Sequence, residues 1–328
     1  MINKTLKELA QAKNLYIGAA VLPNLLKKDS KYAETLSSEF NMVGTESCMK
    51  WRTIHPVMDK YTFDEADELM EFTLKNKMTF RGHTLVYSRK MPEWFNDIKD
   101  KKIMEEQLEE HIKTVVGRYK GKIYAWDVIN EEFDFDNNHQ QSPLFKMLGI
   151  SHIEKAFRWA HEADPDLKLF VNEFGIEEIN KRSDLTYDMI IALLKNKVPV
   201  HGIGFQMHRA LGNGGEWLNK LPDMESMRKN FQRFADLGLE IHITEMDIPI
   251  QKGTGSYEDK LIEQARAYKE ILEVAFSIRN FKALVVWGVT DLYNWIDLIG
   301  QSKDAPLLFD MEYKKKPAYF EVQKLLQD

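Results

Sequence analysis

Short apolar runs alternate with longer amphipathic segments along most of this chain. Eight runs rich in β-branched and aromatic residues predict strands at Tyr16–Val21, Met42–Thr45, Thr79–Val86, Ile123–Ile129, Lys168–Asn172, Gly202–Met207, Leu239–Ile243 and Leu284–Val289. Helical spacing predicts helices at Tyr32–Phe40, Phe63–Asn76, Ile103–Tyr119, Ile153–Ala163, Leu185–Lys195, Met224–Leu237, Asp259–Phe276 and Pro317–Leu326. Strict alternation through eight units favours an α/β fold of the closed (β/α)8 type, a TIM barrel, over an open doubly wound sheet.

Residues at the ends of the predicted helices match the usual capping preferences. Asp29, Thr62, Ser151 and Ser183 precede helical segments and are predicted N-caps. Gly238 follows the sixth helical segment, where a residue with positive φ commonly ends a helix.

Chain length alone permits two domains, but the pattern favours one. The chain has 328 residues, of which 44% are hydrophobic. Barrels of this type run to such a length as a single domain, and no linker rich in Gly, Ser or Pro interrupts the alternation. We therefore predict one barrel domain over residues 1–328.

Composition excludes several classes of protein. The formal net charge of −6 argues against a nucleic-acid partner. Cys48 is the single cysteine, which rules out an intrachain disulfide and a zinc site built on cysteines. No apolar run reaches the ~18 residues of a membrane helix, and the segment 1–8 lacks the apolar core of a signal peptide. The default expectation is a cytoplasmic protein, or a secreted one if a leader has been removed.

Two glutamates follow or end apolar runs in the segments Trp126–Glu131 and Ile241–Asp247. In a barrel of parallel strands the carboxyl ends of the strands face the active site, so Glu131 and Glu245 are predicted to point at substrate. Two such carboxylates are what a retaining glycosidase needs.

Further polar residues and one tryptophan gather at the same strand ends. They are Glu46, His83, Asn130, Glu131, Gln206, His208, Glu245, Asp247 and Trp287, and they come from six strands. Their convergence predicts a catalytic pocket.

From about Tyr16 to its end the chain resembles family 10 glycoside hydrolases, the endo-β-1,4-xylanase family. Six motifs carry the resemblance in the family's order: Phe40-Asn41 with Glu46 and Met49-Lys50-Trp51, Arg81-Gly82-His83-Thr84-Leu85-Val86, Trp126-Asp127-Val128-Ile129-Asn130-Glu131, Gly202-Ile203-Gly204-Phe205-Gln206-Met207-His208, Ile243-Thr244-Glu245-Met246-Asp247 and Trp287-Gly288-Val289-Thr290-Asp291.

The resemblance implies a retaining enzyme that cleaves xylan or xylo-oligosaccharides without a cofactor or metal. Glu131 would be the acid/base and Glu245 the nucleophile that forms a glycosyl-enzyme intermediate. The two carboxyl groups are then expected about 5–5.5 Å apart.

Supporting roles are implied for the neighbouring residues. Asn130 resembles the family's contact to the sugar 2-hydroxyl, and His208 and Asp247 would form hydrogen bonds around Glu245. Sugar hydroxyls on the non-reducing side would be bound by Glu46, Lys50, His83 and Gln206, with Trp287 and Trp295 stacking on pyranose faces.

The chain departs from the family where sugars are bound. Ser47 replaces an asparagine, and Tyr87-Ser88-Arg89-Lys90 stands where the family has Trp-His-x-Gln; Ser47, Tyr87 and Lys90 are predicted to re-form that part of the pocket. Asn172-Glu173-Phe174-Gly175 replaces Asn-Asp-Tyr-Asn on the leaving-group side. We hypothesise that Arg89 and Lys90 favour an acidic branch such as a glucuronyl group.

Several alternatives stay open at this level. A related β-glycanase or exo-acting oligosaccharide hydrolase would share the same glutamates, and a non-catalytic carbohydrate-binding barrel would share the fold. A metal-dependent hydrolase using His83, His208 and His242 is disfavoured, because His242 and Glu245 lie three residues apart and a strand's period of two would point them to opposite faces. The remaining tryptophans Trp51, Trp126 and Trp159 are predicted to be core residues.

Overall fold

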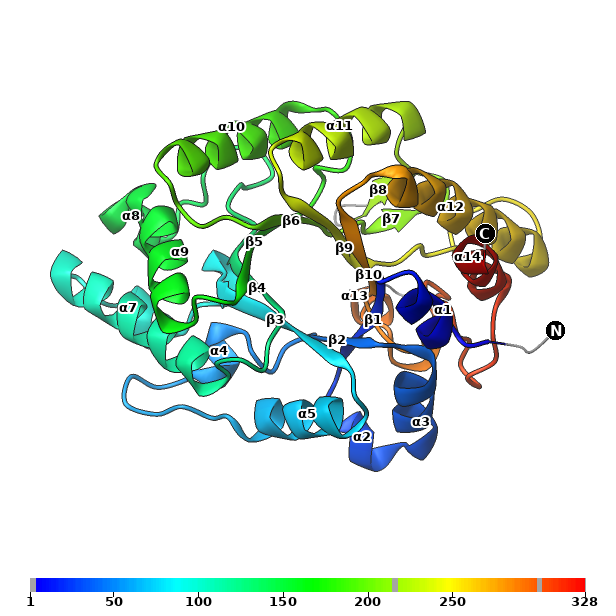
Figure 1. The fold of residues 1–328 in the computed structure, drawn as a ribbon, viewed down its shortest axis with the longest axis horizontal. Helices are drawn as coiled ribbons and strands as arrows, with labels where there is room; N and C mark the ends of the chain where they lie inside the picture. Colours follow the sequence, from blue (N-terminus) through cyan, green and yellow to red (C-terminus); the bar gives the residue numbers. More distant parts are fainter. Residues whose placement is uncertain (1–3, 214–217, 300–302, 328) are drawn as a thin grey trace.

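Eight parallel strands form a closed barrel in this computed structural model, which describes residues 4–213, 218–299 and 303–327. The strands are β1 (Tyr16–Val21), β2 (Met42–Thr45), β3 (Thr79–Val86), β4 (Ala125–Asn130), β5 (Lys168–Glu173), β6 (Gly202–Phe205), β9 (Glu240–Met246) and β10 (Phe281–Val286). Hydrogen bonds between β1 and β10 complete the ring, which Figure 1 shows with helices outside it. The predicted (β/α)8 fold is therefore confirmed. The first three residues of the segment examined for a signal peptide lie outside the described ranges.

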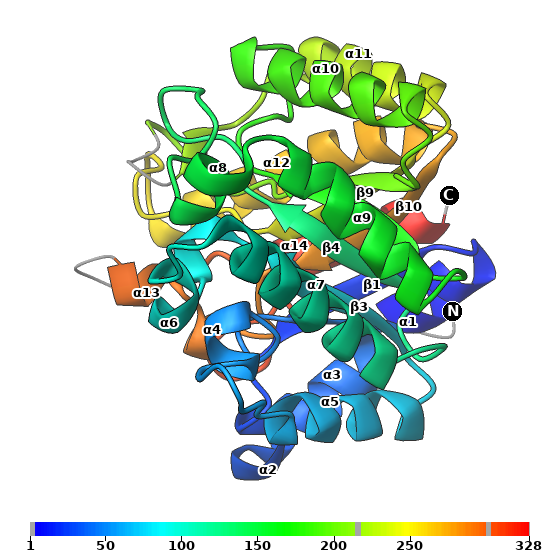
Figure 2. The same ribbon diagram turned by 90° about the vertical axis from the view of Figure 1, so that its left-hand side faces the viewer.

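Helices cover the outer surface of the barrel. The long ones are α3 (Ser30–Glu39), α5 (Asp64–Lys75), α7 (Lys101–Arg118), α9 (Ser151–Ala163), α10 (Lys181–Lys195), α11 (Met224–Asp236), α12 (Tyr257–Ser277) and α14 (Pro317–Gln327). Shorter helices are α1 (Leu6–Ala12), α2 (Leu25–Lys28), α4 (Trp51–Ile54), α6 (Glu93–Asn96), α8 (Pro143–Leu148) and α13 (Ile296–Ile299), with 3₁₀ turns η1 (Ser88–Lys90) and η2 (Asp291–Tyr293). Figure 2 shows α6, α8 and α13 on the side of the barrel opposite the two termini.

Strand boundaries agree with the sequence pattern most closely at β1, β2 and β3, whose predicted and observed ranges are identical. The prediction was wrong at β10, which begins and ends three residues earlier. Trp287 and Val289 are buried although they lie beyond the strand, so their apolar character reflects a packed loop. A two-stranded sheet of β7 (Arg209–Ala210) and β8 (Asn219–Lys220) was not predicted.

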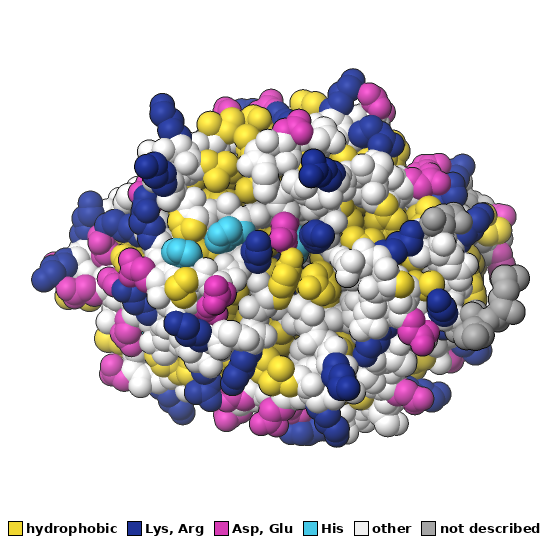
Figure 3. All heavy atoms as spheres, in the orientation of Figure 1, with side chains coloured by type: hydrophobic (Ala, Val, Ile, Leu, Met, Phe, Trp, Pro, Cys, Tyr) yellow, Lys and Arg dark blue, Asp and Glu magenta, His cyan; other side chains and the backbone are white. Residues whose placement is uncertain are grey.

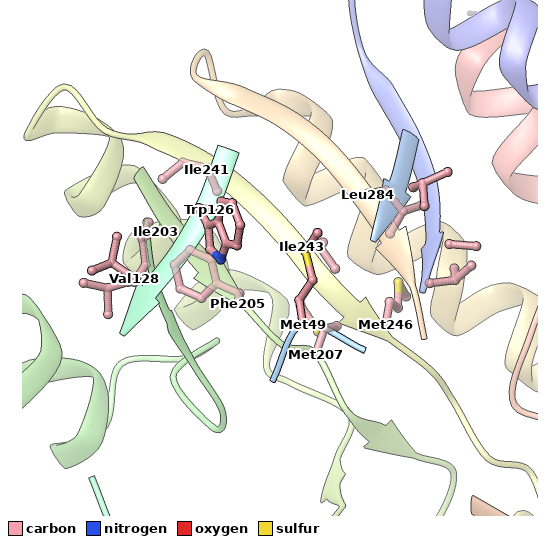
Figure 4. Close-up of a cluster of buried hydrophobic side chains, with 14 of the residues drawn as sticks. Met49, Trp126, Val128, Ile203, Phe205, Met207, Ile241, Ile243, Met246 and Leu284 are labelled. Carbon is pink, nitrogen blue, oxygen red and sulfur yellow. The ribbon is translucent and has the colours of Figure 1, made fainter. Parts of the chain in front are cut away.

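The main hydrophobic core lies between the barrel and its helices. Trp126 and Val128 of β4 belong to this core together with Ile203 and Phe205 of β6, and Figure 4 shows these side chains in one cluster. Trp51, Trp126 and Trp159 are at most 9% exposed, which confirms them as core residues. Gly82 is required beside Trp126, since a Cβ atom there would lie 2.5 Å from the indole ring.

An irregularity in β9 changes which side chains point into the barrel. Between Leu284 and Val286 of β10 the register shifts, so β9 holds one extra residue near Glu245. His242 packs on Phe170 at 4.3 Å between ring centroids, and Glu245 accepts a hydrogen bond from Asn172, two residues along the same strand. Both side chains therefore face the interior, so the expectation that His242 and Glu245 point to opposite faces was wrong. A bulge re-aims a side chain in this way.

One of the four predicted N-caps is confirmed. Asp29 accepts hydrogen bonds from the first turn of α3, whereas Thr62 precedes the N-cap of α5 and donates instead to the carbonyl of Thr53 in α4. Ser151 is the first residue of α9 rather than its cap. Ser183 lies inside α10, where it forms a capping box with Asn180. Gly238 follows α11 with φ of 83°, as predicted.

Figure 3 shows the molecule in the orientation of Figure 1. Charged side chains of both signs are interspersed over the face that is turned to the viewer. Within the described ranges, every helix is too short or too polar to cross a lipid bilayer.

Candidate active site

A cleft of about 510 Å³ lies among the loops and strand ends of the barrel. It is lined by Glu46, Ser47, Lys50, Arg52, Thr53, His83, Tyr87, Arg89, Lys90, Asn130, Glu131, Phe135, Phe174, Gln206, His208, Glu245, Trp287 and Trp295. The structure thus brings together every predicted site residue except Asp247, which lies behind His208. Arg52, Thr53, Arg89, Phe135 and Phe174 line the cleft in addition to the predicted set.

Glu245 is held from two sides. Asn172 donates from Nδ2 to Oε1 at 2.7 Å, and His208 Nε2 lies 3.2 Å from Oε2. Burial alone would raise the pKa of Glu245, but the hydrogen bond from His208 and the charges of His83, His208 and Lys50 lower it. Glu245 is therefore an ionised carboxylate in a buried position, as a nucleophile requires.

Behind Glu245, a second carboxylate fixes His208. Asp247 Oδ2 lies 2.9 Å from His208 Nδ1 and accepts a hydrogen bond of 2.6 Å from the indole N–H of Trp295. Burial alone would lower the pKa of His208, but Asp247 and Glu245 raise it to about 10. His208 is accordingly a cation between two carboxylates, and Trp295 is oriented by its indole N–H as well as exposed to the cleft.

Glu131 directly follows β4 with φ of 53°, a conformation rare for residues other than glycine. Its backbone N–H donates to the carbonyl of Asn172 at 3.0 Å, which fixes this turn. The Tyr87 hydroxyl donates to Oε2 at 2.8 Å, and Gln206 Nε2 donates to Oε1 at 3.2 Å. Strained backbone of this kind concentrates at functional sites, where surrounding contacts maintain it.

Asn172 connects the two glutamates and was missing from the predicted site. Its amide donates to Asn130 Oδ1 at 2.8 Å as well as to Glu245, and its own oxygen accepts from the Thr244 hydroxyl at 2.6 Å. Gly204 makes room for it, because a Cβ atom there would lie 2.2 Å from the Asn172 oxygen. The sequence held one signal, since Asn172 ends one predicted strand and Asn130 directly follows another.

Part of the cleft wall consists of the half-buried carboxylate Glu46, the lysine Lys50 and the indole of Trp287. Burial raises the pKa of Glu46 to about 7, with Lys50 opposing this rise and Glu245 adding to it. Lys50 lies 5.5 Å from the ring centre of Trp287, and burial lowers its pKa. Hydrogen-bonding groups beside an aromatic face suit the polar rim and apolar face of a sugar ring.

His83 reaches the cleft from β3 and is anchored within the barrel. Its Nδ1 lies 2.9 Å from Asp127 Oδ2, and Arg81 binds the same carboxylate with both terminal nitrogens. Burial alone would raise the pKa of Asp127, but Arg81 and His83 lower it. Asp127, a buried residue of β4, thus orients the His83 ring through its Nδ1 atom.

Arg89 also lines the cleft, beside a pair of aromatic rings whose centres lie 5.4 Å apart. The guanidinium carbon lies 4.7 Å from the ring centre of Phe135 and 5.9 Å from that of Phe174. Arg89 Nη1 is also 3.6 Å from Glu131 Oε2.

No group of three His, Cys, Asp or Glu side chains in the described part of the chain has the geometry of a metal site.

Comparison with known proteins gives consistent matches. Residues 5–325 match the model of glycosyl hydrolase family 10. Endo-1,4-beta-xylanase B of Thermotoga neapolitana is 39% identical over 98% of this chain and 92% of its own length. Xylanase 10B of Thermotoga petrophila, solved in complex with xylobiose, superposes with a TM-score of 0.92 at 41% identity and covers 100% of this chain and 98% of its own. An intracellular xylanase of Thermoanaerobacterium saccharolyticum gives a TM-score of 0.88 at 32% identity, with 98% of both chains covered.

These matches span nearly the whole chain and agree with the closed barrel and its cleft. The chain belongs to glycosyl hydrolase family 10.

Proposed function

We propose that this protein is a retaining glycoside hydrolase that cleaves β-1,4-xylosidic bonds of xylan or xylo-oligosaccharides by double displacement. The observation that carries the proposal is the placement of Glu131 and Glu245 in one cleft, joined through Asn172, with different surroundings for each carboxylate. Different surroundings permit different protonation states, and the mechanism needs one acid and one nucleophile.

In the first displacement Glu245 attacks the anomeric carbon and a glycosyl-enzyme ester forms. The bond from that carbon to the leaving-group oxygen breaks, and Glu131 gives its proton to this oxygen. The hydrogen bonds from Asn172 and His208 hold the Glu245 carboxylate in place for attack. Positioning of this kind removes much of the entropic cost of bringing the reactants together.

In the second displacement Glu131 takes a proton from water, whose oxygen attacks the anomeric carbon from the side the leaving group vacated. The ester bond breaks, and Glu245 is released as a carboxylate beside the His208 cation. Two inversions restore the original anomeric configuration. Asn130 is positioned by Asn172 to contact the sugar 2-hydroxyl.

Xylan is the favoured substrate because the similar proteins are xylanases. The curated relative is an endo-1,4-beta-xylanase, and the Thermotoga petrophila structure holds xylobiose. Glu46, Lys50, His83 and Gln206 offer hydrogen-bonding groups to a bound glycone, beside Trp287 and Trp295. Ser47, Tyr87 and Lys90 also line this cleft and would complete that pocket.

The first experiment is product analysis by chromatography after incubation with xylohexaose. The parent protein is expected to cut it, and Glu245→Ala to lose at least about 10⁴-fold in kcat. Glu131→Ala should keep most of its first-step rate on an aryl xyloside, whose good leaving group needs no proton. Failure of the parent to cut xylohexaose or other β-1,4-glycans would leave the non-catalytic binding barrel as the better description.

For location we propose the cytoplasm, by analogy with the intracellular relative from Thermoanaerobacterium saccharolyticum. Fractionation of the source cells followed by immunoblotting tests this. Finding the protein in the culture medium would overturn it.

A further inference from the structure

Arg89 lies at the acid/base end of the cleft and has no explanation in the hydrolytic steps. It belongs to η1, directly after β3, and its side chain is 24% exposed. Phe135 and Phe174 lie beside its guanidinium, and Glu131 is its carboxylate neighbour at 3.6 Å.

The leaving group passes this end of the cleft, because the acid that protonates the departing oxygen is Glu131. A second hollow of about 340 Å³ shares Phe135 and Phe174 with the main cleft and extends past Gly175 to Lys181. A substituent on a leaving-group sugar therefore has space beyond the two rings. Arg182 lies over the far side, 3.9 Å from the Phe174 ring centre, and its carboxylate neighbour there is Glu173.

We propose that Arg89 is a specificity-determining residue that binds the carboxylate of a uronic-acid branch on the leaving-group side of the substrate. The proposal rests on the hydrolase function above and names a substrate class for it. A guanidinium matches a carboxylate with two parallel N–H donors, and aromatic contacts favour one orientation of its plane.

Such a branch should act through binding. Its carboxylate would pair with the Arg89 guanidinium inside the cleft, so an acidic branch should lower KM and raise kcat/KM. A merely structural Arg89 would alter neither quantity in a branch-dependent way.

The test compares two substrates that differ in one group. One is a xylo-oligosaccharide with a single uronic-acid branch, and the other is the same molecule after reduction of the carboxyl group to an alcohol. The parent enzyme should cut the acidic substrate with about a three- to tenfold higher kcat/KM, as suits a partly exposed ion pair. The branch should appear on the product that carries the new non-reducing end.

Variants assign this preference to Arg89. Arg89→Gln should lose it and cut both substrates equally, and Arg89→Lys should keep part of it through charge alone. Arg118→Gln is the matched control, because Arg118 is also paired with a carboxylate, Asp67, and stacked on an aromatic ring, Phe63, but lies on α7 outside the cleft. It should retain the parent's preference.

Two results overturn the inference: equal cutting of both substrates by the parent, or an unchanged preference in Arg89→Gln. Activity on neutral xylohexaose separates this from failure of the proposed function. If the parent cuts the hexamer but cuts the acidic and the reduced substrate equally, the hydrolase function is retained and the proposed role of Arg89 is rejected.

Discussion

At the scale of single residues, the proposed nucleophile Glu245 depends on a neutral asparagine as well as on charged groups. Asn172 is fully buried and donates to Glu245, to which it presents a neutral amide rather than a charge. We expect Asn172→Ala to lower kcat about 10- to 150-fold, because a hydrogen bond to a charged group contributes about 1.5–3 kcal/mol. Steady-state kinetics on xylohexaose measure this.

A graded control accompanies that variant. Thr244→Val removes only the neutral bond from Thr244 to the Asn172 oxygen, so its loss should be smaller, about 0.5–1.5 kcal/mol. A parental kcat in Asn172→Ala would contradict the assigned positioning role. Equal losses in both variants would indicate general disruption of the site.

His208 makes the protein's stability depend on pH in a defined window. Its pKa is raised from 6.5 to about 10 in the folded state by Asp247 and Glu245, against the effect of burial. The folded state therefore holds the proton more tightly than the unfolded chain, and the resulting stabilisation is complete below pH 6.5. It falls as pH rises and is lost above about pH 10.

The check is urea unfolding of the parent and His208→Gln at several pH values between 6 and 10. The free energy of unfolding of the parent should fall relative to that of the variant across this window. A difference between the two proteins that stays constant with pH would show that His208 is not charged in the folded state.

At the scale of elements, strand irregularities and helix caps place side chains that regular periodicity would misplace. The bulge in β9 turns Glu245 into the barrel, although alternation from His242 predicts the outer face. Asp29 caps α3 and also accepts from the hydroxyls of Tyr293 and Tyr313, so it connects a helix start with the C-terminal segment. Its side chain thus does more than that of an ordinary N-cap.

This difference predicts unequal effects of two cap substitutions. Asp29→Ala should lower the free energy of unfolding by about 2 kcal/mol, because the cap and both tyrosine bonds are lost. Asp100→Ala should cost about 1 kcal/mol, since Asp100 caps α7 with backbone contacts alone. Urea titration of both variants gives the comparison. Equal losses would mean that the tyrosine contacts contribute nothing measurable.

At the scale of the whole molecule, we propose that the barrel behaves as one domain. Pairing of β1 with β10 joins the two ends of the chain, and Tyr319 of α14 donates to the buried Glu39 of α3 at 2.7 Å. Because every strand shares its core with both neighbours, partial loss of the ring would expose apolar surface on each side.

Thermal unfolding should therefore be a single transition. Far-UV circular dichroism, tryptophan fluorescence and residual activity are expected to give coincident curves, and the calorimetric enthalpy should equal the van't Hoff enthalpy. Two separated transitions, or a protease-resistant half of the chain, would instead show two cooperative units.

Sequence patterns predicted most of the fold, because the buried side of a strand or helix is visible in the local spacing of its apolar and polar residues. The periodicity of α7 and the apolar runs of β1 to β3 predict these elements without any knowledge of the residues that they contact. The first residue of a helix was harder to predict. Asn180 and Ser183 are both residue types that cap helices, and the structure was needed to show that Asn180 is the N-cap and that Ser183 completes the capping box. At β10 the apolar run continued into a buried loop and shifted the predicted strand.

The sequence by itself determined the barrel class, the two glutamates and the residues around them, because these follow from local alternation and from motifs at strand ends. Tertiary structure decided which side chains meet. The bridge from Asn172 to Glu245, the cation at His208 and the place of Arg89 beside Phe135 and Phe174 all join residues far apart in the chain. Hydrogen bonds and charges act over a few ångströms in space, and only the closed barrel brings those groups within that distance.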